Sequence, residues 1–200
     1  DTALNISHLR RSLLALSVAA ATATATATVH AAPAPDFNYD LSNGAYNSDG
    51  DVFNNATLTG TSQNAGVGLL NVTLAGNLIN QGNINLTTTS PSDVPSGIAV
   101  LLNSSIAGDL VNNGDITVSG NGAMGLDLYQ ANIAGNVNNN GKISVTGQNA
   151  NGMMITSTQA RINNSGTITA RGLDSAGIEI ENARFTGQMT GAPFTSDINN

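Results

Sequence analysis

The sequence predicts an all-β protein whose main part is a right-handed parallel β-helix, a solenoid of about 4–5 coils. Three observations lead to this prediction. Two sequence motifs recur in phase, apolar residues alternate after each motif, and charged residues make up only 10% of the 200 residues. Ordinary globular domains carry about 25% charged residues, and disordered chains usually combine low hydrophobicity with high net charge. We therefore expect a regular, folded, strand-rich domain.

The first motif consists of an aliphatic residue, three mainly polar residues, a glycine, any residue and an isoleucine. Its four copies occupy residues 78–84, 110–116, 137–143 and 162–168. After the motif glycine, apolar residues alternate along the chain, as in Ile116 and Val118. Residues i and i+2 point to the same face of a strand. The alternation therefore predicts half-buried strands.

A second motif, a glycine followed by alternating aliphatic residues, keeps in phase with the first. Its copies occupy residues 97–100, 125–128, 152–155 and 177–180. The repeat of 25–32 residues is long enough for three short strands and their turns, which make one coil of a β-helix. One such unit cannot bury its own apolar face, so the units must stack. The alternative is a β-sandwich or barrel, whose turns recur about every 8–12 residues.

Each copy of the first motif places an asparagine two residues before its glycine. Glycine tolerates positive φ, and asparagine enters the left-handed region more readily than most residues. We therefore expect tight turns with positive φ at glycines such as Gly141. Asparagines at equivalent turns can also stack from coil to coil, with their amides bonded in ladders. The predicted structural turn residues are Asn80, Gly82, Asn112, Gly114, Asn139, Gly141, Asn164 and Gly166.

Residues 1–31 have the pattern of a secretion signal peptide, helical or disordered, that is removed on export. Arg10 and Arg11 form a positively charged start, and residues 13–21 form an apolar stretch. Small residues before the predicted cut place it between Ala31 and Ala32. The apolar stretch is shorter than the roughly 20 residues that a membrane span needs. An uncleaved anchor, an alanine-rich helix and a twin-arginine signal are the alternatives.

The segments at the two ends differ from the repeats. Residues 32–60 hold four of the seven Phe and Tyr residues, and we interpret them as an N-terminal cap, because the end of a β-helix exposes strand edges and core. Residues 61–200 form the repeats. Residues 187–197 are an insertion that we expect to project as a surface loop. Residues 198–200 resemble the opening of a fifth copy of the first motif, so we expect a fragment with further coils downstream.

The leader, the low charge, the absence of cysteine and the Asn/Gly turns together resemble the passenger domain of a Gram-negative autotransporter. The resemblance covers residues 10–200. It implies type V secretion: export through the inner membrane, display on the cell surface or release, and a partner in the protein's own C-terminal outer-membrane β-barrel. The function it implies is a structural stalk or adhesin, with a host-surface or carbohydrate ligand that the sequence does not identify. Filamentous haemagglutinin-like secreted adhesins share the β-helix.

The rival function is an exported carbohydrate-active enzyme, a polysaccharide lyase or hydrolase, with its site downstream. Such an enzyme needs paired carboxylates, or acidic calcium ligands with a basic residue. The candidates in this chain are Asp109, Asp115 and Asp127, with Arg161 or Arg171. They come from different parts of the repeat. Asp115 occupies a variable turn position, and Asp127, like Glu179, alternates with apolar residues and should face out. We therefore expect no catalytic residues in this chain.

Cofactors, metals and nucleic acid are not expected as ligands either. Both histidines, His8 and His30, lie in the leader and cysteine is absent, which removes the usual zinc ligands. Residues 47–51 resemble a calcium loop, but the first and last ligand positions of that loop are alanines here, so we interpret them as a tight turn. Six basic residues against thirteen acidic ones do not form the positive stripe that phosphates require.

Overall fold

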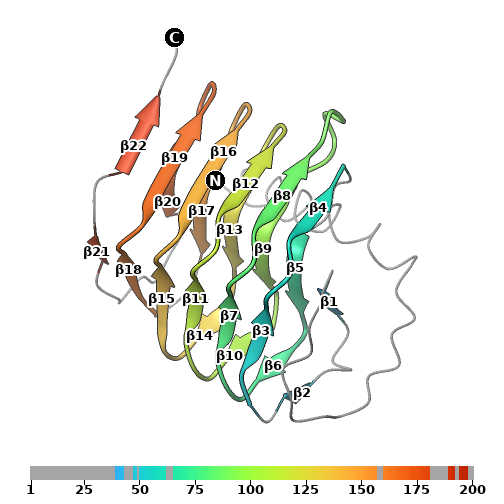
Figure 1. The fold of residues 1–200 in the computed structure, drawn as a ribbon, viewed down its shortest axis with the longest axis vertical. Helices are drawn as coiled ribbons and strands as arrows, with labels where there is room; N and C mark the ends of the chain where they lie inside the picture. Colours follow the sequence, from blue (N-terminus) through green and yellow to red (C-terminus); the bar gives the residue numbers. More distant parts are fainter. Residues whose placement is uncertain are drawn as a thin grey trace.

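The computed structural model confirms the predicted fold class: the chain is an all-β parallel solenoid of about five turns. It describes residues 39–42, 47–48, 50–61, 65–156, 160–180, 189–191 and 194–197. These residues contain no helix, and none of them forms a helix that could span a bilayer. The predicted signal peptide and its cut between Ala31 and Ala32 lie outside the described residues. Figure 1 shows the coils side by side along the chain.

Four parallel sheets, which we name A to D, run along the solenoid. Sheet A contains β1 (Tyr39–Ser42), β5 (Ala65–Leu70), β9 (Ser96–Leu101), β13 (Met124–Tyr129), β17 (Asn151–Thr156) and β20 (Ala176–Ile180). Sheet B contains β2 (Asn47–Ser48), β6 (Thr73–Leu74), β10 (Ser105–Ile106) and β14 (Asn132–Ile133).

Sheets C and D complete each coil. Sheet C contains β3 (Val52–Asn54), β7 (Leu78–Asn80), β11 (Leu110–Asn112), β15 (Asn136–Asn139), β18 (Arg161–Asn164) and β21 (Met189–Gly191). Sheet D contains β4 (Leu58–Gly60), β8 (Ile84–Thr87), β12 (Ile116–Ser119), β16 (Lys142–Thr146), β19 (Thr167–Arg171) and β22 (Phe194–Asp197).

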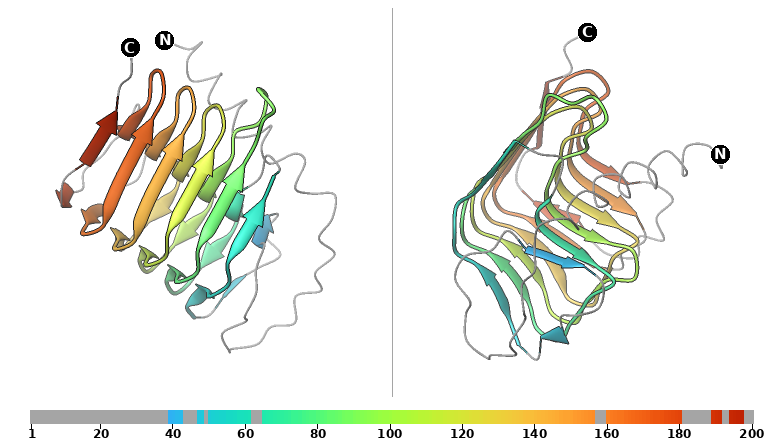
Figure 2. Two further views of the ribbon diagram at one scale, coloured as in Figure 1. Left: turned by 45° about the horizontal axis from the view of Figure 1, so that its top comes forward. Right: turned by 90° about the vertical axis from the view of Figure 1, so that its right-hand side faces the viewer.

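The prediction of three strands per coil is wrong, because the coils with a sheet B strand have four. The sheet B strands are two residues long, and each contributes one buried residue such as Leu74 or Ile106. A period of two cannot be recognised in two residues, so the sequence pattern does not reveal them. Figure 2 shows how equivalent strands follow one another from coil to coil.

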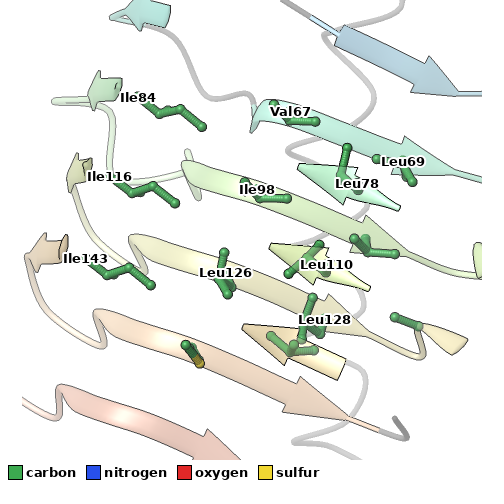
Figure 3. Packing of buried hydrophobic residues seen from close by; sticks show 14 of the residues in the cluster. Val67, Leu69, Leu78, Ile84, Ile98, Leu110, Ile116, Leu126, Leu128 and Ile143 are labelled. Atoms are coloured by element: carbon green, nitrogen blue, oxygen red, sulfur yellow. The ribbon is translucent and has the colours of Figure 1, made fainter. Parts of the chain in front are cut away.

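The strands pair in register, so that equivalent side chains form columns along the solenoid. Ile116 pairs with Ile84 on one side and with Ile143 on the other. Leu110 is placed in the same way between Leu78 and Val137. Both columns point into the interior, where they join side chains of sheet A such as Ile98 and Leu126 in one cluster (Figure 3), and they are fully or almost fully buried. Burial of one such side chain stabilises the fold by about 1.5–3 kcal/mol, so the stack supplies the apolar core that a single coil lacks.

The sheets differ in what they present to solvent. Strands of sheet D alternate between buried and more exposed residues, as in β8, where Ile84 and Leu86 are buried and the residues between and after them are exposed. In sheet A, by contrast, every residue of β9, β13 and β17 is buried. Their outward positions carry residues such as Ala99, Leu101 and Met154. Sheet A therefore has the nearly continuous apolar character of a sheet buried on both faces.

The two ends of the chain also add strands to the stack. The segment predicted as a cap contributes β1 to β4, which pair with β5 to β8 respectively. The prediction of a surface loop over residues 187–197 is wrong for β21 and β22. Met189 pairs with Ile162 and Phe194 with Ile168, so apolar residues of that segment take the places of the motif aliphatics. Residues 198–200, predicted to open the fifth motif copy, lie outside the described residues.

Candidate functional site

Asn54 and the four asparagines of the first motif form one continuous hydrogen-bonded ladder between sheets C and D. The Nδ2 of each donates to the Oδ1 of the next. The four bonds are 2.6 Å from Asn54 to Asn80, 2.7 Å from Asn80 to Asn112, 2.8 Å from Asn112 to Asn139 and 2.7 Å from Asn139 to Asn164. All five side chains are at most 1% exposed. Asn54, which lies before the predicted repeats, was not among the turn residues expected from the sequence.

Each ladder amide also holds its own turn. The Nδ2 of Asn112 donates to the carbonyl oxygen of Gly114 at 2.9 Å, and Asn80 and Asn139 do the same to Gly82 and Gly141. The ladder backbone accepts bonds from the next coil in turn, as in the 2.7 Å bond from the N–H of Asn140 to the carbonyl oxygen of Asn112. Buried amides need such full pairing, because an unpaired one costs about 1–3 kcal/mol.

The motif glycines have a different physical role from the one predicted. Positive φ at Gly141 is wrong: the described glycines with positive φ are Gly120, Gly122, Gly147 and Gly172. The motif glycines are needed because the coils approach each other there. A Cβ on Gly141 would overlap the carbonyl oxygen of Gly114 and lie 2.8 Å from its carbonyl carbon. The same overlap with the preceding coil recurs at Gly82, Gly114 and Gly166.

The left-handed residues lie in other turns of the coil. Asn71 and Asn103, which follow the sheet A strands, have φ of 54° and 60°. Asn149 and Asp174 take φ of 54° in the turns between sheets D and A. Asparagine therefore does adopt the left-handed conformation in the solenoid, as expected from the sequence, and so does Asp174. The motif turn, however, uses its asparagine for stacking.

The candidate catalytic carboxylates are occupied by bonds between coils. Oδ1 of Asp109 accepts from the backbone N–H of Asn136 at 2.7 Å, and Oδ2 accepts from the Nδ2 of Asn138 at 3.2 Å. Oδ1 of Asp115 accepts in the same way from the N–H of Lys142 at 3.3 Å. Both carboxylates therefore act as acceptors for the coil that follows, which is a structural use.

The other candidate catalytic residues, Asp127, Arg161 and Arg171, do not form a common site with Asp109 and Asp115. Asp109 precedes sheet C and Asp115 precedes sheet D, whereas Asp127 lies in sheet A. Asp127 takes the outward position that the alternation predicts, paired with Ala99 and Met154. It is nevertheless only 2% exposed. Arg161 and Arg171 occupy the ends of neighbouring strands in sheets C and D. No pair of carboxylates with a basic residue is assembled from these five.

Asp51, in the loop of residues 47–51 that resembles a calcium site, also bonds to the next coil. Oδ1 of Asp51 accepts from both the backbone N–H and the Nδ2 of Asn77, each at 2.8 Å. Asn77 in turn bonds through Oδ1 to the N–H of Asp109 at 2.6 Å. This gives a second polar ladder beside the first. Within the described part of the chain, no three His, Cys, Asp or Glu residues are grouped so that they could hold a metal ion.

The outward side of sheet D carries rows of polar side chains. Apart from Lys142 and Arg171 at strand ends, these side chains are neutral and bear hydroxyl or amide groups; they lie on paired strands and are exposed or half-buried. We call the neutral residues of this surface the hydroxyl face; they are Thr59, Asn85, Thr87, Thr117, Ser119, Ser144, Thr146, Thr167 and Thr169. The sequence signal that could have found it is the polar half of the alternation, for example Thr117 between Ile116 and Val118.

Comparison with known families adds the last finding. The family model for the BigA third pectate lyase-like domain matches residues 16–194, which span every described strand except the last three residues of β22. Comparison with the curated proteins and with the solved structures gives no match. The match and the solenoid agree, because both describe a stack of coils. The chain belongs to the family of the BigA third pectate lyase-like domain.

Proposed function

We propose that this chain is a rod-forming segment of an exported surface protein of the autotransporter type, and that it serves as a stalk or adhesin. The observation that carries the proposal is the uninterrupted ladder from Asn54 to Asn164, which ties the coils into one stiff unit. Each coil adds about 4.8 Å of length, so five coils extend the rod by about 24 Å. BigA is itself an autotransporter-like surface protein, which supports export and surface display.

The use of the acidic side chains supports a structural rather than a catalytic role. Asp51, Asp109 and Asp115 each accept a backbone N–H from the following coil. A catalytic acid or base must instead be within reach of a substrate proton. The words "pectate lyase-like" in the family description agree with the coiled architecture, and fold alone does not assign an activity.

The hydroxyl face is the surface that we assign to ligand contact. Its strands pair in register, so that its polar side chains form rows, and their neutral hydroxyl and amide groups suit a neutral, hydroxyl-rich ligand such as a carbohydrate. Thr117→Asp with Ser144→Asp should weaken binding of the full-length protein to host-cell glycans. The matched control is Thr73→Asp with Asn132→Asp, which adds the same charge at exposed positions of sheet B.

Surface display is tested on bacteria that carry the full-length protein. Intact cells should bind an antibody raised against residues 50–180, and added protease should remove that signal without lysis. Recovery of the protein from the cytoplasm alone would overturn the proposal.

The enzyme alternative is tested on the purified full-length protein. Polygalacturonate with calcium is the substrate, and the ultraviolet absorbance of the unsaturated product of β-elimination is the readout. We expect no product. Product formation that is lost in the Asp109→Asn, Asp115→Asn double variant would make this segment catalytic.

A further inference from the structure

The first turn of the asparagine ladder, residues 54–56, is built differently from the turns that follow it. In the later turns the position two residues after the asparagine is glycine, whereas in the first turn it is Ala56. The N–H groups of Gly82, Gly141 and Gly166 donate to the asparagine carbonyl of the preceding coil at 3.0–3.1 Å. The N–H of Ala56 instead donates to the Oδ1 of Asn54, in its own turn, at 3.2 Å.

The direction in which a Cβ atom would point from the motif glycines shows where the methyl group of Ala56 lies. A Cβ on Gly82 would fall 2.6 Å from the carbonyl carbon of Ala56, and one on Gly141 would fall 2.8 Å from that of Gly114. These positions therefore point toward the preceding coil. Strands β3 and β4 are the edge strands of sheets C and D, so at Ala56 this direction leads to the side on which a preceding coil would stack. The methyl group packs at the end of the apolar core and is partly exposed.

We propose that the Asn54–Ala56 turn is a built-in stop, which closes the N-terminal edges of sheets C and D to any further coil stacked in register. The partner that it excludes is a second copy of this chain, whose coils carry the same repeat. An incoming turn would bring its carbonyl group against the methyl of Ala56. It would also need the Ala56 N–H, which is already donated to Asn54. An exposed strand edge can pair with a strand of another chain. The turn at Ala56 prevents such pairing at the N-terminal edges of sheets C and D.

The opposite end of the ladder is not closed in this way. The Nδ2 of Asn164 donates to the carbonyl oxygen of Gly166 at 3.1 Å, but the residue that pairs with Asn164 in β21 is Gly191, which has no side chain to continue the ladder. The ladder therefore has two unlike ends. At the N-terminal end, the Oδ1 of Asn54 accepts a bond from the N–H of Ala56 in its own turn. At the C-terminal end, the ladder stops because the next coil has Gly191 in place of an asparagine.

The first experiment tests the free space at position 56 in the purified 200-residue chain. Ala56→Val should change the unfolding equilibrium constant by less than about tenfold, whereas Gly141→Val should raise it by at least about thirtyfold, as expected for overpacking against backbone. An effect of Ala56→Val as large as that of Gly141→Val would mean that the position is already enclosed, and the proposal would fall.

The second experiment tests the stop itself by sedimentation velocity over a range of protein concentrations. Ala56→Gly removes the methyl group and restores the glycine of the later turns, so that the carbonyl group of a preceding coil can approach as it does at Gly82 and Gly141. Its apparent self-association constant should therefore be at least about tenfold stronger than that of the wild-type chain. Thr117→Ala, an exposed substitution in β12 in the middle of sheet D and away from both edges, is the control and should behave as wild type. A folded Ala56→Gly variant with wild-type sedimentation at every concentration would overturn the proposal.

Discussion

Asn112 lies in the middle of the asparagine ladder, and its replacement by alanine measures what the ladder contributes to stability. Its side chain is fully buried. It accepts a 2.7 Å bond from Asn80 and donates bonds of 2.8 Å to Asn139 and 2.9 Å to the carbonyl oxygen of Gly114. Asn112→Ala removes all three.

The expected loss follows from these bonds. Three hydrogen bonds contribute about 1 kcal/mol each in net terms, and a buried acceptor left without a bond costs about 1–3 kcal/mol. The Oδ1 of Asn139 loses the bond from Asn112 and stays buried in the variant. We therefore expect the free energy of unfolding to fall by about 3–5 kcal/mol. At the C-terminal end of the ladder, Asn164→Ala removes two bonds and should cost less.

The assay is equilibrium urea unfolding of the purified chain, followed by far-ultraviolet circular dichroism. The control is Asn113→Ala in the same turn, because Asn113 is exposed and its side chain accepts one exposed bond, from Asn140 at 2.8 Å. That substitution should change the stability by no more than about 0.5 kcal/mol. If Asn112→Ala costs no more than Asn113→Ala, the ladder does not hold the coils together and the reasoning is refuted.

Three further predictions use the same unfolding assay. Gly141→Ala should lower the free energy of unfolding by about 1–3 kcal/mol, because its Cβ meets backbone that cannot rotate away. The control Gly50→Ala, whose Cβ would meet nothing within 4 Å, should be neutral. Equal effects of the two substitutions would contradict the close-approach explanation. Ile143→Ala should cost about 2–5 kcal/mol through the cavity it leaves in the core, whereas Leu173→Ala, at a residue that is 51% exposed, should be nearly neutral; a small effect at Ile143 would count against a tightly packed column. Asp109→Ala should lower the free energy of unfolding by about 1–3 kcal/mol, because three bonds that Asp109 accepts are lost. Asp109→Asn should lose less, because asparagine keeps one acceptor oxygen. Identical losses would contradict a role for Asp109 in bonding between coils.

Sequence periodicity was sufficient for the architecture because the core is made of repeated positions. Ile84, Ile116 and Ile143 lie at equivalent places in the motif, and they pair directly in sheet D. A repeat that cannot bury its own apolar residues has to stack, and the coil length follows from the motif spacing. Local composition was less informative at the ends, where Met189 and Phe194 replace the usual aliphatics and yet continue the stack.

The site was harder to predict, because its properties depend on neighbours from other coils. Asp109 and Asp115 are equally compatible with solvent exposure, catalysis or stacking when the sequence is considered alone. Their role is decided by the N–H groups of Asn136 and Lys142, each 27 residues away. The alternation correctly places Asp127 on the outward side of its strand, but it does not reveal that this side of sheet A is buried and that Asp127 is only 2% exposed.

The motif glycines show what the sequence determines and what only the tertiary structure determines. The sequence by itself identified Gly82, Gly114, Gly141 and Gly166 as equivalent positions and determined the all-β coil, since spacing and alternation are properties of one chain in order. It could not distinguish a glycine needed for positive φ from one needed for close approach. Only the tertiary structure decided this, because the atom that forbids a side chain at Gly141 belongs to Gly114, in the coil before it. Register between coils, the sealed turn at Ala56 and the hydroxyl face are decided at the same level, because each is a relation between residues that stacking brings together.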